Sequence, residues 1–243
     1  MAGNAISTRG NGVINCGLGV ILPNGIGDSD NPDDYFDPST HIATEENFIA
    51  FLEAGGKYDD KSLVGYKVQL SNSVDYNNRL WVIADVGHHV DQPNTYDLIS
   101  EKCFNYMRFS GNTQYWRDSD ARSWLNNTFY NGFSENFKSH MNNIIYDSNG
   151  GTYNDDKIIL PSLTEVNGTD YYFVVEGTAY PIFTDNNSRI KYLTTFSNYG
   201  SWWTRSRDTA IASRVFYIDR DGSVSKAFEF SNNNTLSPVL RVS

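Results

Sequence analysis

The amino-acid sequence predicts an α+β fold made of small antiparallel sheets, two short helices and an extended N-terminal arm. Aromatic residues make up 14% of the 243 residues, and such residues favour strands over a helical bundle. One segment near residue 120 has apolar residues at helical spacing, whereas the chain from residue 199 onward consists of short apolar runs separated by turn signals. The helices are therefore expected early and the β structure late.

Residues 1–61 are predicted to form an arm that attaches the protein to a larger assembly. Gly, Asn, Asp and Pro dominate residues 24–39, where no periodicity is visible. A short helix follows within the arm, with Thr44 as its expected N-cap and Gly55–Gly56 at its end. Residues 62–243 are predicted to be one domain, because no change in composition marks a boundary after residue 62.

The middle of the chain alternates between predicted strands and helices. Ser119 or Asp118 is expected to cap the clearest helix, and a second short helix is expected to begin at Ser134. Ser162 and Glu165 have the spacing of a capping box. The predicted strands are residues 65–70, 79–85, 156–161 and 171–175, whereas residues 96–109 are compatible with either structure.

The end of the chain reads as antiparallel β structure. The segment "DRDG" at residues 219–222 is a hairpin turn signal between two of the apolar runs. The predicted strands here are residues 201–206, 214–219, 223–230 and 238–243.

Composition and charge exclude several classes of partner. The formal net charge is −10, and no cluster of Lys and Arg is present to bind phosphates, so nucleic acid and anionic membranes are not expected as partners. No run approaches 18 apolar residues, so membrane insertion is not expected. The first residues lack the apolar core of a signal peptide, and we therefore expect synthesis in a cytoplasm without cleaved export.

The usual catalytic and metal-binding patterns are missing from the sequence. His88 and His89 are adjacent, so in a strand their side chains would point to opposite faces and could not share a metal. Cys103 has no histidine near it, and the paired acidic residues lie in polar loops or at a helix N-terminus. The sequence therefore predicts no enzyme activity, no metal and no cofactor. The triplet "QPN" at residues 92–94 is similar to a sugar-binding triplet of calcium-dependent lectins.

The segments "RLWVIAD", "DSDARSWLNNTFYNGFSENFKSHM", "DKIILPSLTEV" and "YGSWWTRS" follow one another in this order. Together they resemble a bacterial and phage domain family of unknown function with a C-type-lectin-like fold. That fold is shared with formylglycine-generating enzymes and with the variable receptor-binding proteins of diversity-generating retroelements. The resemblance spans residues 62–243. The helical signature within it is carried by Ser119, Arg122, Trp124, Leu125, Asn126, Phe129 and Phe133.

The resemblance implies a scaffold role for its most conspicuous residues. A strand containing Trp202, Trp203 and Arg205 is expected in the central sheet, next to the helix that carries Trp124 and Leu125. One of the two tryptophans is expected to be deeply buried, and the other to line a second core or an interface. Arg122 and Arg205 are expected to be buried or half-buried and bonded to backbone carbonyls or a carboxylate.

The resemblance also implies where a ligand would bind. Retroelement-type members bind through exposed residues of the final hairpins, which correspond to residues 207–237 of this chain. The candidate exposed residues are Arg207, Asp208, Asn232, Asn233 and Asn234. Three consecutive asparagines suit an adaptable recognition loop, although a plain solvent loop has the same composition. Enzymes of this fold use cysteines or a metal near these loops, and this chain has no cysteine after Cys103.

These observations predict a non-enzymatic surface protein of a bacteriophage virion, made in the host cytoplasm. It would be a capsid decoration protein, a head fibre or a tail adhesin. The N-terminal arm would contact other virion proteins, and the C-terminal loops would face a glycan or protein of the host surface. The alternative is a bacterial carbohydrate- or protein-binding module. The sequence leaves open whether the protein is a homo-oligomer.

Overall fold

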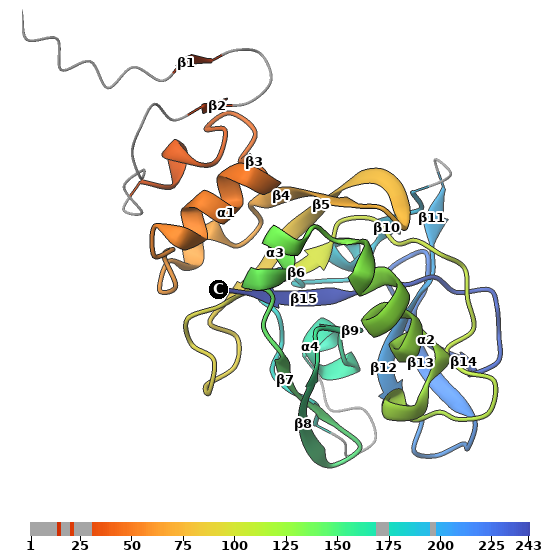
Figure 1. Ribbon diagram of the computed structural model, residues 1–243. Coiled ribbons are helices and arrows are strands. Elements are labelled where there is room, and N and C mark those ends of the chain that lie inside the picture. The colour runs from red at the N-terminus through yellow and green to blue at the C-terminus, as the bar shows by residue number, and fades with distance from the viewer. Residues whose placement is uncertain (1–13, 16–19, 22–30, 169–174, 195–197) are drawn as a thin grey trace, which may run out of the picture.

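The computed structural model describes residues 14–15, 20–21, 31–168, 175–194 and 198–243. It is a mixed α+β structure of small sheets with short helices around them (Figure 1). Most of the predicted strand 171–175 lies outside the described residues. In the described part of the chain, no helix is long and apolar enough to span a bilayer.

The largest sheet has six strands and contains both early and late parts of the chain. The strand order is β3-β4-β5-β6-β15-β9, and all neighbours are antiparallel except β3 and β4. The C-terminal strand is paired on both sides, because Leu240 lies opposite Leu98 on one neighbour and Ile158 on the other. The strands are β3 (Ile42–Thr44), β4 (Lys67–Asn72), β5 (Asp75–Val86), β6 (Tyr96–Ser100), β9 (Ile158–Ile159) and β15 (Val239–Val242).

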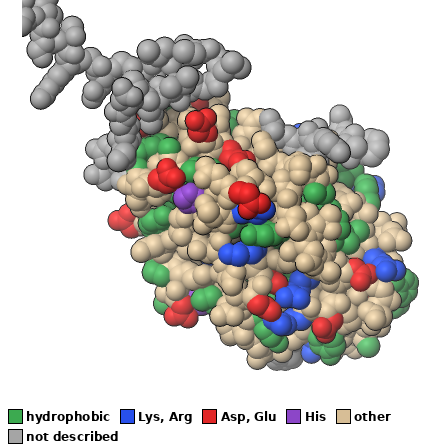
Figure 2. Space-filling model, viewed as in Figure 1, with side chains coloured by type: hydrophobic (Ala, Val, Ile, Leu, Met, Phe, Trp, Pro, Cys, Tyr) green, Lys and Arg blue, Asp and Glu red, His purple; other side chains and the backbone are tan. Residues whose placement is uncertain are grey.

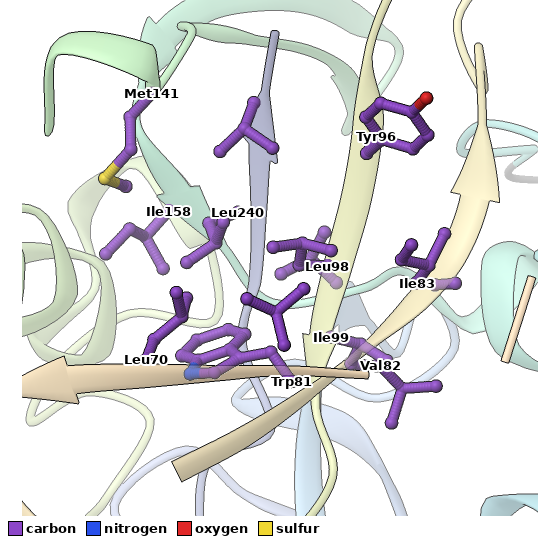
Figure 3. Packing of buried hydrophobic residues seen from close by; sticks show 14 of the residues in the cluster. Leu70, Trp81, Val82, Ile83, Tyr96, Leu98, Ile99, Met141, Ile158 and Leu240 are labelled. Atoms are coloured by element: carbon purple, nitrogen blue, oxygen red, sulfur yellow. The ribbon is translucent and has the colours of Figure 1, made fainter. Parts of the chain in front are cut away.

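The main hydrophobic core packs against this sheet. Figure 3 shows Trp81 on β5 beside Leu70 on β4, with Leu98 and Leu240 from the neighbouring strands close by. All four side chains are fully buried. Burying a side chain of this size stabilises the fold by about 1.5–3 kcal/mol. The packing on this sheet is therefore a large part of the stability of the domain.

Four α-helices surround the sheets in the described residues, and their N-caps are the predicted ones. The Thr44, Ser119 and Ser134 side chains each accept a hydrogen bond from a first-turn amide, and Ser162 with Glu165 forms the predicted capping box. The helices are α1 (Glu45–Glu53), α2 (Asp120–Trp124), α3 (Glu135–His140) and α4 (Leu163–Asn167). Short 3-10 turns occupy Pro32–Asp34, Lys61–Leu63, Trp116–Asp118, Tyr130–Gly132 and Asn187–Arg189.

The predicted boundary between residues 61 and 62 falls inside a continuous unit of packing. β3 pairs with β4 in the six-stranded sheet, and Phe48 and Phe51 of α1 belong to the same core as Tyr96. The helix is amphipathic, and its apolar side packs against residues of the predicted domain 62–243. The described residues from Tyr35 onward therefore belong to the main domain.

A separate three-stranded sheet contains the first three of the four strands predicted from residue 201 onward. It consists of β12 (Trp202–Arg207), β13 (Arg214–Ile218) and β14 (Val224–Phe228), in that order. The predicted hairpin turn joins β13 to β14, and Gly222 has a φ of +77°, which favours glycine. Three two-stranded pairs complete the structure: β1 (Ile14–Asn15) with β2 (Val20–Ile21), β7 (Ile144–Ser148) with β8 (Gly151–Asp156), and β10 (Lys191–Tyr192) with β11 (Tyr199–Gly200).

The expectation that the tryptophan strand lies in the central sheet is wrong. β12 is an outer strand of the three-stranded sheet, because its free side meets irregular segments and not another strand: the Trp203 amide donates to Thr235 O and the Arg205 amide to Pro161 O. Its two tryptophans are both fully buried and face different cores, Trp203 the main core and Trp202 a smaller one. The predicted alternation of faces is confirmed.

Candidate functional site

The open end of the three-stranded sheet carries a cleft of about 570 Å³. We call it the aromatic cleft. Strands β13 and β14 and the loop that follows them supply its lining: Arg214, Lys226, Ala227, Phe228, Phe230, Ser231, Asn232 and Asn233.

Two phenylalanine rings in this cleft are stacked and exposed. The ring centroids of Phe228 and Phe230 are 5.2 Å apart and the planes are inclined by only 7°. The two side chains are 42% and 56% exposed, respectively. An exposed pair of large apolar side chains on a rigid element is typical of an interaction site, because water contact with both rings is unfavourable.

Two cations lie beside these rings on the same face of the sheet. Arg214 is the register partner of Phe228, and its guanidinium carbon lies 5.0 Å from the centre of that ring. Lys226 lies over the Phe216 ring at 5.2 Å and forms a 3.1 Å ion pair with the Asp208 carboxylate. The cleft thus alternates aromatic and cationic groups along one face.

The loop between Glu229 and Asn234 is held at both ends by backbone hydrogen bonds. The Ser110 amide donates to Glu229 O at 2.9 Å, and the Met107 amide donates to Asn234 O at 3.1 Å. The Glu229 amide donates to Ser213 O on the neighbouring strand. The residues between these two points therefore project from a fixed base, which lowers the entropy lost when a ligand binds.

A second cleft, of about 560 Å³, adjoins the first at Asn232. We call it the helix cleft, because one wall is the turn of π-helix at Leu125–Phe129 that continues α2. Such π turns occur frequently at functional sites. Its lining residues are Tyr106, Met107, Arg108, Asp120, Ser123, Trp124, Asn127, Thr128 and Asn232.

The charged side chains that line the helix cleft, one basic and one acidic, neutralise each other. Arg108 Nε donates to Asp120 Oδ2 at 2.6 Å, so its one basic side chain has a carboxylate partner. Figure 2 shows the same mixture on the face in view, where basic and acidic side chains lie next to one another. Trp124, predicted as a scaffold residue, is half-buried: it stacks on Phe129 at 5.3 Å and also lines this cleft.

Arg205 is the centre of a buried polar network next to the three-stranded sheet. Its guanidinium donates to both carboxylate oxygens of Glu165, at 2.6 and 2.7 Å, and to the Leu160 and Asp147 carbonyls at 3.0 Å. Burial alone would lower the pKa of Arg205, but the Glu165 carboxylate outweighs it and raises that pKa. Burial raises the pKa of the neighbouring Glu176. The prediction that Arg205 binds carbonyls or a carboxylate is confirmed.

Arg122 has a similar structural role on the other side of α2. The Arg122 Nε lies 2.7 Å from Asp156 Oδ1. The same carboxylate accepts hydrogen bonds from Trp116 Nε1 at 3.0 Å and Tyr146 Oη at 2.6 Å. The pair between Arg122 on α2 and Asp156 on β8 therefore holds these two elements together.

The histidine region forms another internal network. His88 Nδ1 lies 2.9 Å from Asp85 Oδ2, and the His88 ring stacks on Tyr180, whose hydroxyl donates to Asp97 Oδ2 at 2.8 Å. Arg241 pairs with Asp97 on its other side. Among the described residues, no group of three or more His, Cys, Asp and Glu side chains is arranged to hold a metal.

The lectin-like triplet at residues 92–94 is used to anchor its own loop. The Gln92 amide nitrogen donates to Asn143 O at 2.7 Å, and its oxygen accepts from the Ile145 amide at 3.1 Å. Gln92 Oε1 also accepts from Arg241 Nη1. A side chain with these partners holds β7 against the loop.

The structure gives three outcomes for the five residues predicted to be exposed. Asn232 and Asn233 are exposed and line the aromatic cleft, and Asn232 also lines the helix cleft. Exposure of Asp208 and Asn234 was predicted wrongly, since both are buried: Asp208 pairs with Lys226, and Asn234 closes the base of the loop. Arg207 is half-buried and donates to Asn149 Oδ1 at 2.6 Å, away from the clefts.

Sequence reasoning missed the aromatic and cationic residues of the site. Phe228 and Phe230 are two positions apart, and in an extended chain such positions share a face. Lys226 lies two positions earlier, which indicated that this face is at least partly exposed. The signal was present in "SVSKAFEF", but the cross-strand partner Arg214 required the hairpin register.

The comparisons with known proteins concern the same part of the chain. Neither the curated proteins nor the solved structures include a match. One family model matches residues 95–243, which contain β6, α2, the three-stranded sheet, β15 and both clefts; its description is "Domain of unknown function (DUF6273)". That match covers more than half of the sequence, and the chain is therefore a member of the DUF6273 family.

Proposed function

We propose that this chain is a non-enzymatic recognition domain that binds a glycan through the aromatic cleft. The observation that carries the proposal is the stacked, exposed pair formed by Phe228 at the end of β14 and Phe230 on a loop whose base is fixed. The C–H faces of sugar rings pack against flat aromatic rings. A rigid aromatic platform therefore binds a sugar with little loss of conformational entropy.

The rim of the platform supplies the polar part of such a site. Asn232 and Asn233 are exposed beside Phe230, and each side-chain amide both donates and accepts hydrogen bonds. Sugar hydroxyls also donate and accept, so the two chemistries match. Apolar surface with a few convergent polar groups is the usual composition of a small-ligand site.

The finer fold assignment and the biological setting belong to the same proposal. We propose a C-type-lectin-like arrangement, supported by the sequence resemblance and by the C-terminal strand β15, which pairs with β6 inside the main sheet. β3 and α1 lie at one end of the molecule and the β13–β14 hairpin lies toward the other (Figure 1). Attachment through the N-terminal region to a bacteriophage particle would leave the clefts facing outward, as in a capsid decoration protein, head fibre or tail adhesin.

Binding to a glycan array before and after the change Phe230→Ala tests the proposed function. We expect the wild type to bind a subset of glycans and the variant to lose at least tenfold in affinity. Tyr199→Ala is the matched control, because Tyr192 and Tyr199 form another exposed aromatic pair, with centroids 4.6 Å apart, on β10 and β11. Equal losses in both variants, or none in Phe230→Ala, would refute the assignment of the cleft.

The particle setting has a separate test. Mass spectrometry of purified phage particles from the host strain is expected to detect this chain at a fixed ratio to the major capsid protein. Detection only as a free protein in the lysate would remove the virion part of the proposal and leave the alternative, a bacterial binding module.

A further inference from the structure

We infer that the aromatic cleft selects a carboxylate-bearing sugar, an acidic unit of a polysaccharide, whose carboxylate pairs with Arg214. The inference rests on the proposed function, since it names the chemical class of the ligand for the same cleft. It is carried by the balance of charge in the cleft and by the orientation of the Arg214 guanidinium.

The cleft has two basic side chains, and one of them has an acidic partner. Lys226 pairs with Asp208, whose side chain is completely buried and so is held permanently in that pair. Arg214 forms no ion pair with any of the described residues, and its Nε is buried without a hydrogen-bond partner in that part of the chain. In a chain with a formal net charge of −10, an aromatic cleft with a surplus positive charge indicates an anionic ligand.

The carboxylate of Glu229, the residue that follows β14, does not neutralise Arg214. Its Oε2 and the Arg214 Nε are each buried without a hydrogen-bond partner among the described residues. Glu229 is buried and does not line the aromatic cleft. The surplus charge therefore remains directed toward a ligand.

The orientation of Arg214 suits a carboxylate beside a stacked sugar. A guanidinium that lies over an aromatic ring can still donate hydrogen bonds from its two terminal nitrogens, and these match both oxygens of a carboxylate. Phe230 extends the platform from the Phe228 ring on which Arg214 rests. A sugar ring on Phe230 with its carboxylate toward Arg214 would satisfy the platform and the charge together.

The neighbouring helix cleft explains why the ligand is expected to be a polymer. The two clefts share Asn232, so a chain of sugars can continue from one to the other. Arg108 in the helix cleft is already paired with Asp120. We therefore assign the acidic unit to the aromatic cleft and a neutral unit to the helix cleft, against the half-buried Trp124.

The test is an array in which every acidic glycan is printed beside its carboxyl-reduced form, together with an oligoglutamate peptide. We expect wild-type protein to bind acidic glycans at least tenfold more tightly than the reduced forms. Arg214→Gln should lose about 10- to 100-fold in affinity, the range for a charge-assisted hydrogen bond, and Arg214→Lys should lose less. Arg220→Gln, at the exposed hairpin turn, makes the same charge change outside the cleft and should bind like the wild type.

The outcomes separate this inference from the proposed function. Equal binding of acidic and reduced glycans, or equal affinities of Arg214→Gln and Arg220→Gln, overturns the acidic sugar and leaves glycan binding in place if Phe230→Ala abolishes it. Failure to bind any glycan, or preference for the oligoglutamate peptide, overturns both. If Arg214→Gln does not fold, as judged by its thermal melt, Arg214→Lys and the carboxyl-reduced glycans still decide the question.

Discussion

The two outer strands of the three-stranded sheet, β12 and β14, differ in the burial and hydrogen bonding of their side chains. On β12 the Trp202 and Trp203 indole nitrogens donate to backbone carbonyls, and Arg205 is enclosed by Glu165 and two further carbonyls. On the other side of the sheet, β14 is half-buried and ends in the exposed Phe228, beside Arg214, which has no acidic partner among the described residues. β12 is therefore part of the scaffold, whereas β14 and its loop carry the proposed ligand-binding cleft.

This difference shows why two arginines of the same sequence can have different structural roles. Arg205 and Arg214 both lie close to aromatic rings, Tyr146 at 5.3 Å and Phe228 at 5.0 Å. A buried arginine must be fully bonded, because an unpaired charge in the interior costs several kcal/mol. Arg214 is only half-buried, so water can still solvate part of its guanidinium when no ligand is bound.

The largest expected effect on the free energy of unfolding comes from the buried tryptophans of β12. Trp203→Ala should lower the free energy of unfolding by about 3–5 kcal/mol, because it leaves a cavity in the main core. Trp202→Ala should give a similar loss from the smaller core. Urea denaturation of both variants measures these losses, and an unchanged midpoint in both would contradict the assignment of β12 to the scaffold.

Removal of the buried charge is the next largest effect. Arg205→Met should cost about 3 kcal/mol, because it leaves the Glu165 carboxylate buried without its partner. The double variant Arg205→Met with Glu165→Gln should be less destabilised than the sum of the two single variants. Additive losses in a double-mutant cycle would mean that the two side chains do not act as a pair.

Lys191, which lies under Trp202, should give a pH-dependent effect. Burial lowers the pKa of Lys191 to about 8, and its ammonium donates to Ser100 O at 2.6 Å, 5.7 Å from the Trp202 ring centre. Above this pKa the unfolded chain still holds the proton that the folded protein has lost. Stability from this group therefore rises with pH between the folded pKa and the unfolded value of about 10.4.

We expect the difference in unfolding free energy between Lys191→Met and the wild type to change by about 1–2 kcal/mol from about pH 7 to about pH 9.5, in favour of the wild type. Burial raises the pKa of Cys103, which lowers stability over part of this range, but both proteins contain that thiol. Urea titrations at each pH provide the measurement. A difference that does not vary with pH would show that Lys191 keeps its proton in the folded state.

The smallest effect on stability is expected on the recognition side. Phe230→Ala should change the free energy of unfolding by no more than about 0.5 kcal/mol, because the side chain is 56% exposed. The same variant should lose glycan binding. A large loss of stability would mean that Phe230 supports the fold, and the contrast between β12 and β14 would disappear.

Local features of the fold were predictable because they depend on neighbouring residues. The Ser119, Ser134 and Ser162 caps, the hairpin at residues 219–222 and the opposite faces of Trp202 and Trp203 all follow from short-range patterns. Each needs only the positions of a few side chains along a helix or strand.

Long-range pairing could not be read in the same way. Nothing near Leu240 specifies that it lies between Leu98 and Ile158, and nothing near Phe48 indicates that it packs with Tyr96. The burial of Asp208 depends on Lys226, which the hairpin brings close. For the site, sequence analysis found Asn232 and Asn233 but not the rings and cations that surround them.

The fixed base of the 229–234 loop makes its tip exchangeable. The hydrogen bonds that hold Glu229 and Asn234 use backbone atoms, so they do not depend on the identity of the four residues between them. Residues 230–233 can therefore be replaced as a cassette while the strands keep their register. We therefore expect substitutions at these four positions to change the lining of the aromatic cleft with little effect on the free energy of folding.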